Sequence, residues 1–113
     1  MKIYISGKIT GLPEEEAKAM FQAAEDFLLD KYKNFEIEVS NPLKLDHTKA
    51  ELLQLTGAKQ SDHKVWVAYM GTDLEALLNC KGIYMLKNWG SSKGARIEHV
   101  VAKEMGLTVE YEQ

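Results

Sequence analysis

Four short runs of β-forming residues alternate along the chain with longer stretches in which apolar residues recur at helical spacing. The runs lie at residues 2–6, 36–39, 82–86 and 107–111. Helical spacing is clearest over residues 13–32, 61–79 and 92–106, whereas residues 43–60 predict only one short helix that ends near residue 57. A strand–helix–strand alternation of this kind predicts a parallel sheet with helices on both faces.

The expected fold is therefore an α/β, Rossmann- or flavodoxin-like three-layer sandwich with a mainly parallel, four-stranded sheet. With 113 residues, the chain corresponds to one domain, residues 1–113. The single cysteine, Cys80, favours a reducing, cytoplasmic setting, and no apolar stretch is long enough for a membrane span. A net charge of −3 without any basic run argues against a nucleic-acid polymer as partner.

The helix ends carry recognisable signals. Pro13 suits the first turn of a helix, and three glutamates follow it. Ser61 or Asp62 is the expected cap of the helix over residues 61–79. Gly106 fits the position just after the last turn of the final helix.

Two Gly-containing loops each follow a strand and lead into a helix, which is where open parallel sheets bind ligands. The first contains Gly7, Lys8 and Ile9, and the second contains Ser92, Gly94 and Arg96. Neither matches a P-loop or a dinucleotide fingerprint. Glycines and helix N-termini can bind an anion such as phosphate, but a tight connection and a simple serine cap explain the same residues.

Two carboxylates, Asp73 and Glu98, fall on helix faces that are otherwise apolar. Because carboxylates are seldom buried without a partner, each needs an explanation. Either they reach solvent at the edge of the face or pair with a partner such as Lys93 or Arg96, or they form a pair of acids in a pocket. Two such acids are the groups that glycosidic-bond chemistry requires.

The remaining residues with reactive side chains give weaker indications. Tyr4, just before the first Gly loop, is either a core aromatic or part of the site. The three histidines His47, His63 and His99 lack metal-ligand spacing, so we expect no metal and no cofactor. Cys80 has no histidine partner nearby in sequence and is expected to be a small core residue.

Three blocks of the chain resemble one known group of enzymes. Residues 4–11 resemble the opening Tyr-x-x-Gly-x-Ile-x-Gly of the 2'-deoxynucleoside 5'-phosphate N-hydrolases. Residues 73–83 resemble their Asp-Leu-x-x-Leu segment, and residues 92–98 resemble their Ser-x-Gly-x-x-x-Glu signature. The wider nucleoside 2-deoxyribosyltransferase superfamily shares the last two blocks, and the similarity is greatest to small bacterial and phage relatives.

The resemblance implies a role for each matching residue. Glu98 would be the nucleophile at the anomeric carbon, and Asp73 would be the acid/base or the carboxylate that positions the sugar. Tyr4 would orient the sugar or the nucleophile. Phosphate or sugar contacts would come from Gly7, Ile9 and Ser92. Apart from the resemblance, Lys8, Gly94 and Arg96 of the same two loops are further candidate phosphate-binding residues. In those families a neighbouring subunit completes the site, so the resemblance also implies a homodimer.

Two functions follow as hypotheses. The first is an N-glycosidase or deoxyribosyltransferase that acts on a nucleoside or nucleoside 5'-monophosphate through the Glu98 nucleophile. The alternative is a non-catalytic module that binds a nucleotide or nucleotide sugar. In both cases the partner is a small molecule, not a nucleic-acid polymer or a membrane.

Overall fold

A computed structural model describes residues 1–113 and contains one sheet of four strands, all parallel. The strands are β1 (Lys2–Ser6), β2 (Glu38–Ser40), β3 (Gly82–Met85) and β4 (Thr108–Tyr111), in the order β2-β1-β3-β4. Tyr4 lies between Ser40 of β2 and Ile83 of β3 in the register. The predicted α/β fold with a parallel sheet is confirmed.

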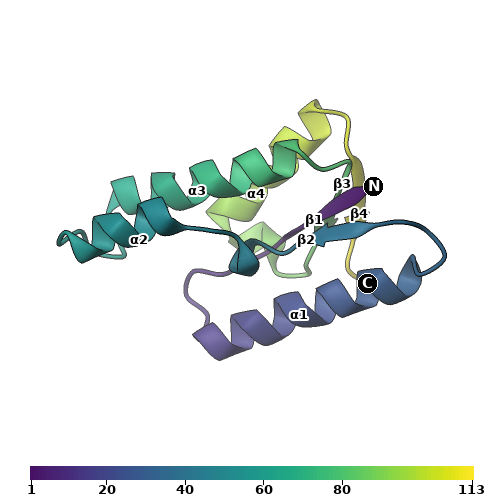
Figure 1. The fold of residues 1–113 in the computed structure, drawn as a ribbon, viewed down its shortest axis with the longest axis horizontal. Coiled ribbons are helices and arrows are strands. Elements are labelled where there is room, and N and C mark those ends of the chain that lie inside the picture. Colours follow the sequence, from purple (N-terminus) through teal and green to yellow (C-terminus); the bar gives the residue numbers. More distant parts are fainter.

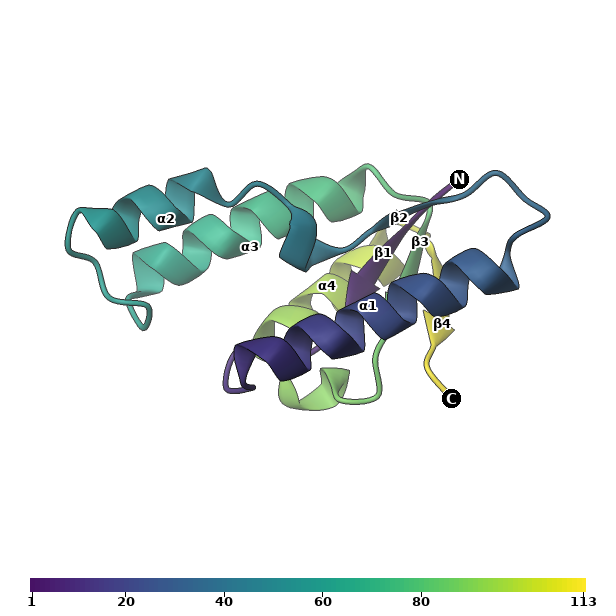
Figure 2. The same cartoon turned by 60° about the horizontal axis from the view of Figure 1, so that its bottom comes forward.

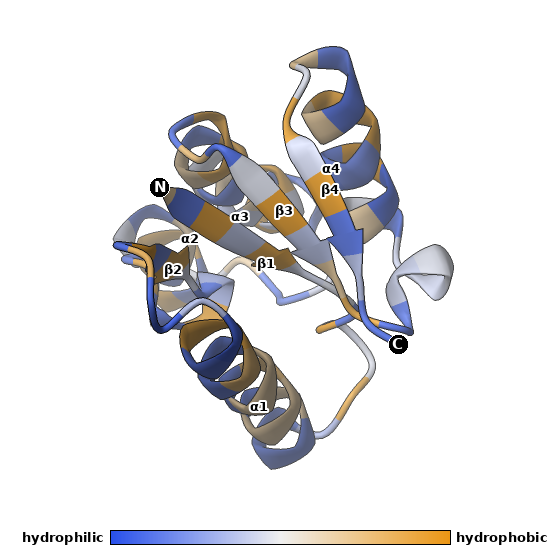
Figure 3. Ribbon diagram, turned by 90° about the vertical axis from the view of Figure 1, so that its right-hand side faces the viewer, coloured by the Kyte–Doolittle hydropathy of each residue, from blue (hydrophilic) through white to orange (hydrophobic).

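Helices cover both faces of this sheet. Helix α1 (Glu14–Lys31) lies on one face, and α3 (His63–Leu78) and α4 (Lys93–Glu104) lie on the other (Figures 1 and 3). Helix α2 (Thr48–Leu55) packs against α3 rather than against the sheet. Together, α2 and the first half of α3 extend past the carboxyl ends of the strands in a molecule of 47 × 30 × 24 Å (Figures 1 and 2).

The element boundaries differ from the predicted ones in two places. The second strand begins at Glu38, whose N–H donates to the Met1 carbonyl, and not at residue 36. The short helix predicted within 43–60 is present as α2. A 3-10 turn that was not predicted, η1 (Pro42–Lys44), precedes it, and Asn41 caps η1 by accepting a hydrogen bond from the Leu43 N–H.

Of the two predicted helix ends described next, the structure confirms one and only partly matches the other. Asp62 occupies the predicted cap position of α3, but its carboxylate accepts a hydrogen bond from the Lys59 N–H and makes no cap bond to the helix. Gly106 adopts a φ of 73°, and the N–H of Leu107 reaches back to the Ala102 carbonyl. The left-handed Gly106 and this hydrogen bond end α4 as predicted, and the chain then continues into β4.

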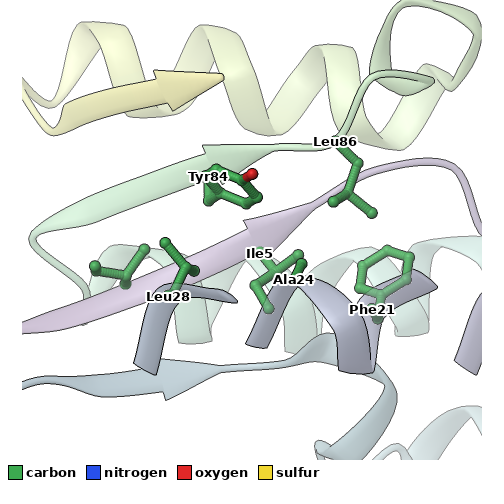
Figure 4. Packing of buried hydrophobic residues seen from close by; sticks show 7 residues of the cluster. Ile5, Phe21, Ala24, Leu28, Tyr84 and Leu86 are labelled. Carbon is green, nitrogen blue, oxygen red and sulfur yellow. The ribbon is translucent and has the colours of Figure 1, made fainter. Parts of the chain in front are cut away.

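The alternation of side chains along the strands divides the core between the two faces. Ile3, Ile5, Tyr84 and Leu86 point toward α1 and pack with Phe21, Ala24 and Leu28 (Figure 4). The intervening strand residues point toward α3 and α4, where Tyr4, Ile83 and Met85 pack with Leu77, Cys80, Ala95 and Ala102. Cys80 is thus a buried core residue, as predicted.

None of the helices combines the length and the apolar character that crossing a membrane requires.

Candidate active site

A buried glutamate on α4 meets two hydroxyl groups of β1. Tyr4 Oη donates to Glu98 Oε2, and Ser6 Oγ donates to Glu98 Oε1, both over 2.6 Å. Tyr4 and Ser6 are two residues apart, so both face α4. Ala95 and Ala102, one turn on either side of Glu98, are almost completely buried. Their small side chains let α4 approach the sheet closely enough for these bonds to form.

Burial dominates the electrostatics of this cluster. Glu98 is only 5% exposed. Its desolvation raises the pKa of the carboxyl to about 7, against the opposing effect of the Ser6 and Tyr4 hydrogen bonds, and the charge of Asp73 adds to the rise. Burial and the two carboxylates raise the pKa of Tyr4 well above its usual value. Tyr4 therefore keeps its proton at neutral pH and acts as a hydrogen-bond donor.

Asp73 forms the second part of the site, on the inward face of α3. Its side chain is 11% exposed, and its Oδ1 lies 2.8 Å from Nε2 of His47, which is 12% exposed. Burial raises the pKa of Asp73, and the hydrogen bond and charge of His47 oppose that rise. The His47 ring in turn packs on Tyr69 of α3, at 4.9 Å between ring centroids.

These partners decide between the explanations offered for the two carboxylates. Neither carboxylate pairs with Lys93 or Arg96: the Lys93 ammonium lies over the Trp66 ring, and the Arg96 guanidinium donates to the Gly90 carbonyl. Lys93 and Arg96 are therefore not the partners of the two acids; Asp73 pairs with His47, and Glu98 accepts from Tyr4 and Ser6. Both acids are instead buried among hydroxyl and imidazole groups on one face of the sheet.

The first Gly loop is tied to the loop that follows β3, because the Lys8 N–H donates to Asn88 Oδ1. A Cβ at Gly7 would lie 2.7 Å from Leu86 Cδ1, so close packing alone requires glycine there. Ile9 packs against the cluster on the α1 face, which is the opposite face of the sheet from Glu98.

The second Gly loop also has internal roles. Ser92 Oγ accepts a hydrogen bond from the Ala95 N–H and so caps α4. A Cβ at Gly94 would lie 3.1 Å from Met70 Sδ, so α4 lies close to α3 at Gly94. The simple cap proposed for Ser92 is thus present in the structure.

Sequence reasoning missed two residues of the site, Ser6 and His47. Ser6 carried a signal, since it lies two residues after Tyr4 and must share its face of the strand. His47 carried none, because it comes from an irregular segment between η1 and α2 that is 26 residues away from Asp73. No group of three or more potential metal-ligating side chains occurs in the structure.

The fold and the site define a small parallel α/β domain with two buried carboxylates at the face between β1, α3 and α4. The chain belongs to the family described as a domain of unknown function, DUF4406, whose model matches residues 1–111. No curated protein and no solved structure matches the chain significantly.

Proposed function

We propose that this protein cleaves or transfers the N-glycosidic bond of a nucleoside or nucleoside 5'-monophosphate, with Glu98 as the nucleophile. The observation that carries the proposal is the buried Glu98 carboxylate, which Tyr4 and Ser6 hold and which feels the charge of a second buried acid, Asp73. Structural acids are usually exposed, whereas acids held at raised pKa in desolvated pockets are typical of catalytic sites. The resemblance of residues 4–11, 73–83 and 92–98 to nucleotide N-hydrolases supports the same chemistry.

The proposed reaction has two displacements. The ionised Glu98 attacks the anomeric carbon, and the bond to the base breaks. Water then attacks the same carbon, releases Glu98 and gives the free sugar or sugar phosphate. In total, one water molecule supplies a hydroxyl group to the sugar and a proton to the base. If a second base attacks instead of water, the same site performs transfer.

The two hydroxyl groups at Glu98 suit this role. Tyr4 and Ser6 fix both carboxylate oxygens, so the nucleophile keeps one orientation without having to reorganise. A pKa of about 7 leaves a large fraction of Glu98 ionised at neutral pH, while burial keeps the carboxylate poorly solvated and therefore reactive.

The phosphate of the substrate is proposed to lie at the loops that follow β1 and β3. The Lys8–Asn88 hydrogen bond joins these loops at the carboxyl ends of the central strands. Parallel sheets bind ligands at this edge.

A second copy of the chain is the proposed protein partner. The outer surface of α4 carries a groove lined by Lys93, Arg96, Ile97, Val100 and Val101. Val100, in the middle of α4, is 59% exposed and adjoins the apolar side chains of Ile97 and Val101, so a second copy could cover this groove. We expect Val100→Glu to convert a dimer into a monomer in light scattering after size exclusion, and a wild-type monomer would refute this partner.

Release of free base from a panel of nucleosides and nucleoside 5'-monophosphates tests the function. The wild-type protein is expected to release base from at least one of them, and Glu98→Ala is expected to lose the activity by a factor of at least about 100. Glu104→Ala, at the exposed end of the same helix, is the matched control. Equal and negligible release by all three proteins would reject the proposal. Saturable nucleotide binding without release would favour the non-catalytic binding module.

A further inference from the structure

His47 and Asp73 form a hydrogen-bonded pair within the site. The distance between Nε2 and Oδ1 is 2.8 Å, and both side chains are nearly buried. A carboxyl group is ordinarily far more acidic than an imidazolium, so the shared proton resides on the imidazole. Nε2 therefore donates, and Asp73 Oδ1 accepts as a carboxylate.

The other oxygen of Asp73 remains open. Oδ2 has no hydrogen-bond partner in the structure, and no buried side-chain oxygen lacks a partner. Oδ2 is consequently accessible to solvent, whereas Oδ1 is occupied by His47. An ionised carboxylate can only accept hydrogen bonds, so Oδ2 is suited to a ligand that donates one.

His47 is itself held in place. Its ring packs on Tyr69 of the same helix that carries Asp73, and its backbone immediately precedes α2. The ring therefore has little freedom to leave Asp73. An imidazole that is fixed in this way is a common means of orienting a buried carboxylate.

We propose that His47 is a positioning residue, which holds Oδ1 of Asp73 so that the free Oδ2 accepts a hydrogen bond from a hydroxyl group of the substrate sugar. The hydrogen bond from the sugar to Asp73 Oδ2 rests on the proposed function, whereas the pairing of His47 with Asp73 does not. Of the two roles left open for Asp73, acid/base catalysis and positioning of the sugar, the proposal assigns the positioning of the sugar.

Loss of the histidine should change how Asp73 titrates. Burial is the main influence that raises the pKa of Asp73, and His47 is the influence that lowers it. The other titratable groups around the pair are Asp46 beside His47, Tyr69 under its ring, and Glu98 and Tyr4, which feel the charge of Asp73. None of these replaces the donor that His47 supplies.

The first test measures Asp73 directly by carbon-13 NMR titration of its carboxyl group, without any substrate. His47→Phe keeps a ring against Tyr69 but removes the donor, and it should move the Asp73 midpoint upward by about 1 pH unit or more. His47→Gln restores an N–H donor and should bring the midpoint back toward that of the wild type. An unchanged midpoint in His47→Phe would overturn the proposal, whatever the activity of the protein.

The second test measures recognition of the hydroxyl group. A 2'-deoxynucleoside 5'-monophosphate has one free sugar hydroxyl, at C3', and its 2',3'-dideoxy counterpart has none. In Glu98→Gln, calorimetry at pH 6 should give about 10-fold tighter binding of the deoxynucleotide. Adding His47→Phe should reduce that preference below about 3-fold, and adding His47→Gln should retain it.

The outcomes separate this proposal from the proposed function. Equal affinity for the two nucleotides in Glu98→Gln would overturn the role of Asp73 Oδ2. A clear preference that depends on His47, together with no base release by the wild-type protein, would support this proposal while rejecting the N-glycosidic activity.

Discussion

The buried Glu98 carboxyl should make the stability of the protein depend on pH. Its pKa is about 7 in the folded protein, against an ordinary value of 4.5. Below pH 4.5 the folded and unfolded chains both hold the proton. Between about pH 4.5 and pH 7 only the folded chain holds it, so the free energy of unfolding falls as the pH rises. Above pH 7 this loss is complete.

The size of the effect follows from the gap between the two pKa values. Each pH unit of that gap corresponds to about 1.4 kcal/mol, so the complete loss is about 3 kcal/mol, and most of it falls between pH 5 and pH 8. For a chain of 113 residues this corresponds to roughly 10 °C in Tm. Glu98→Gln should abolish this dependence, because its amide can accept from one hydroxyl of the pair Tyr4 and Ser6 and donate to the other.

Urea unfolding of both proteins at pH 5, 6, 7 and 8 measures the effect. The difference in unfolding free energy between Glu98→Gln and the wild type should grow by about 2–3 kcal/mol in favour of the variant over this range. The other titrating groups contribute largely equally to both proteins and cancel in the difference. Glu104→Gln should follow the wild type, since Glu104 is exposed. Parallel curves for wild type and Glu98→Gln would refute the reasoning from burial.

Three further substitutions test the packing that positions the site. Gly7→Ala brings a methyl group against the fully buried Leu86 and should lower the unfolding free energy by about 1–3 kcal/mol in urea titration; an unchanged midpoint would show that the loop is free to move. Gly94→Ala meets only the flexible thioether of Met70, so its loss should stay below about 1 kcal/mol, and a larger one would mean that α3 and α4 cannot adjust. Ser92→Ala removes the cap of α4 and should cost about 1 kcal/mol in thermal unfolding, whereas no change would indicate that water replaces the cap.

The fold was largely predictable because its signals are periodic. β-forming residues occur in short runs such as 2–6 and 82–86, and apolar residues recur at helical spacing between the runs. These two patterns were enough to predict a parallel sheet between two layers of helices. The anomaly of acids on apolar helix faces identified Asp73 and Glu98, and both are buried in the structure.

What the sequence did not predict depends on contacts between segments that are distant along the chain. His47 approaches Asp73 through an irregular loop, which has no period to detect. Arg96, one of the predicted phosphate ligands, turns back to the Gly90 carbonyl because its exposed position on α4 places it over η2 (Trp89–Ser91). The prediction of a capping bond from Asp62 was wrong, because its carboxylate accepts from the Lys59 N–H instead.

The central claim, a covalent bond between Glu98 and the anomeric carbon, is tested most directly by the configuration of the sugar product. In aqueous methanol, part of the sugar should be captured as a stable methyl glycoside, whose anomeric configuration NMR can assign. Two successive displacements, the first by Glu98, predict the same configuration as in the starting nucleotide. An inverted methyl glycoside would mean that the solvent displaces the base directly, and it would contradict the assignment of Glu98 as nucleophile.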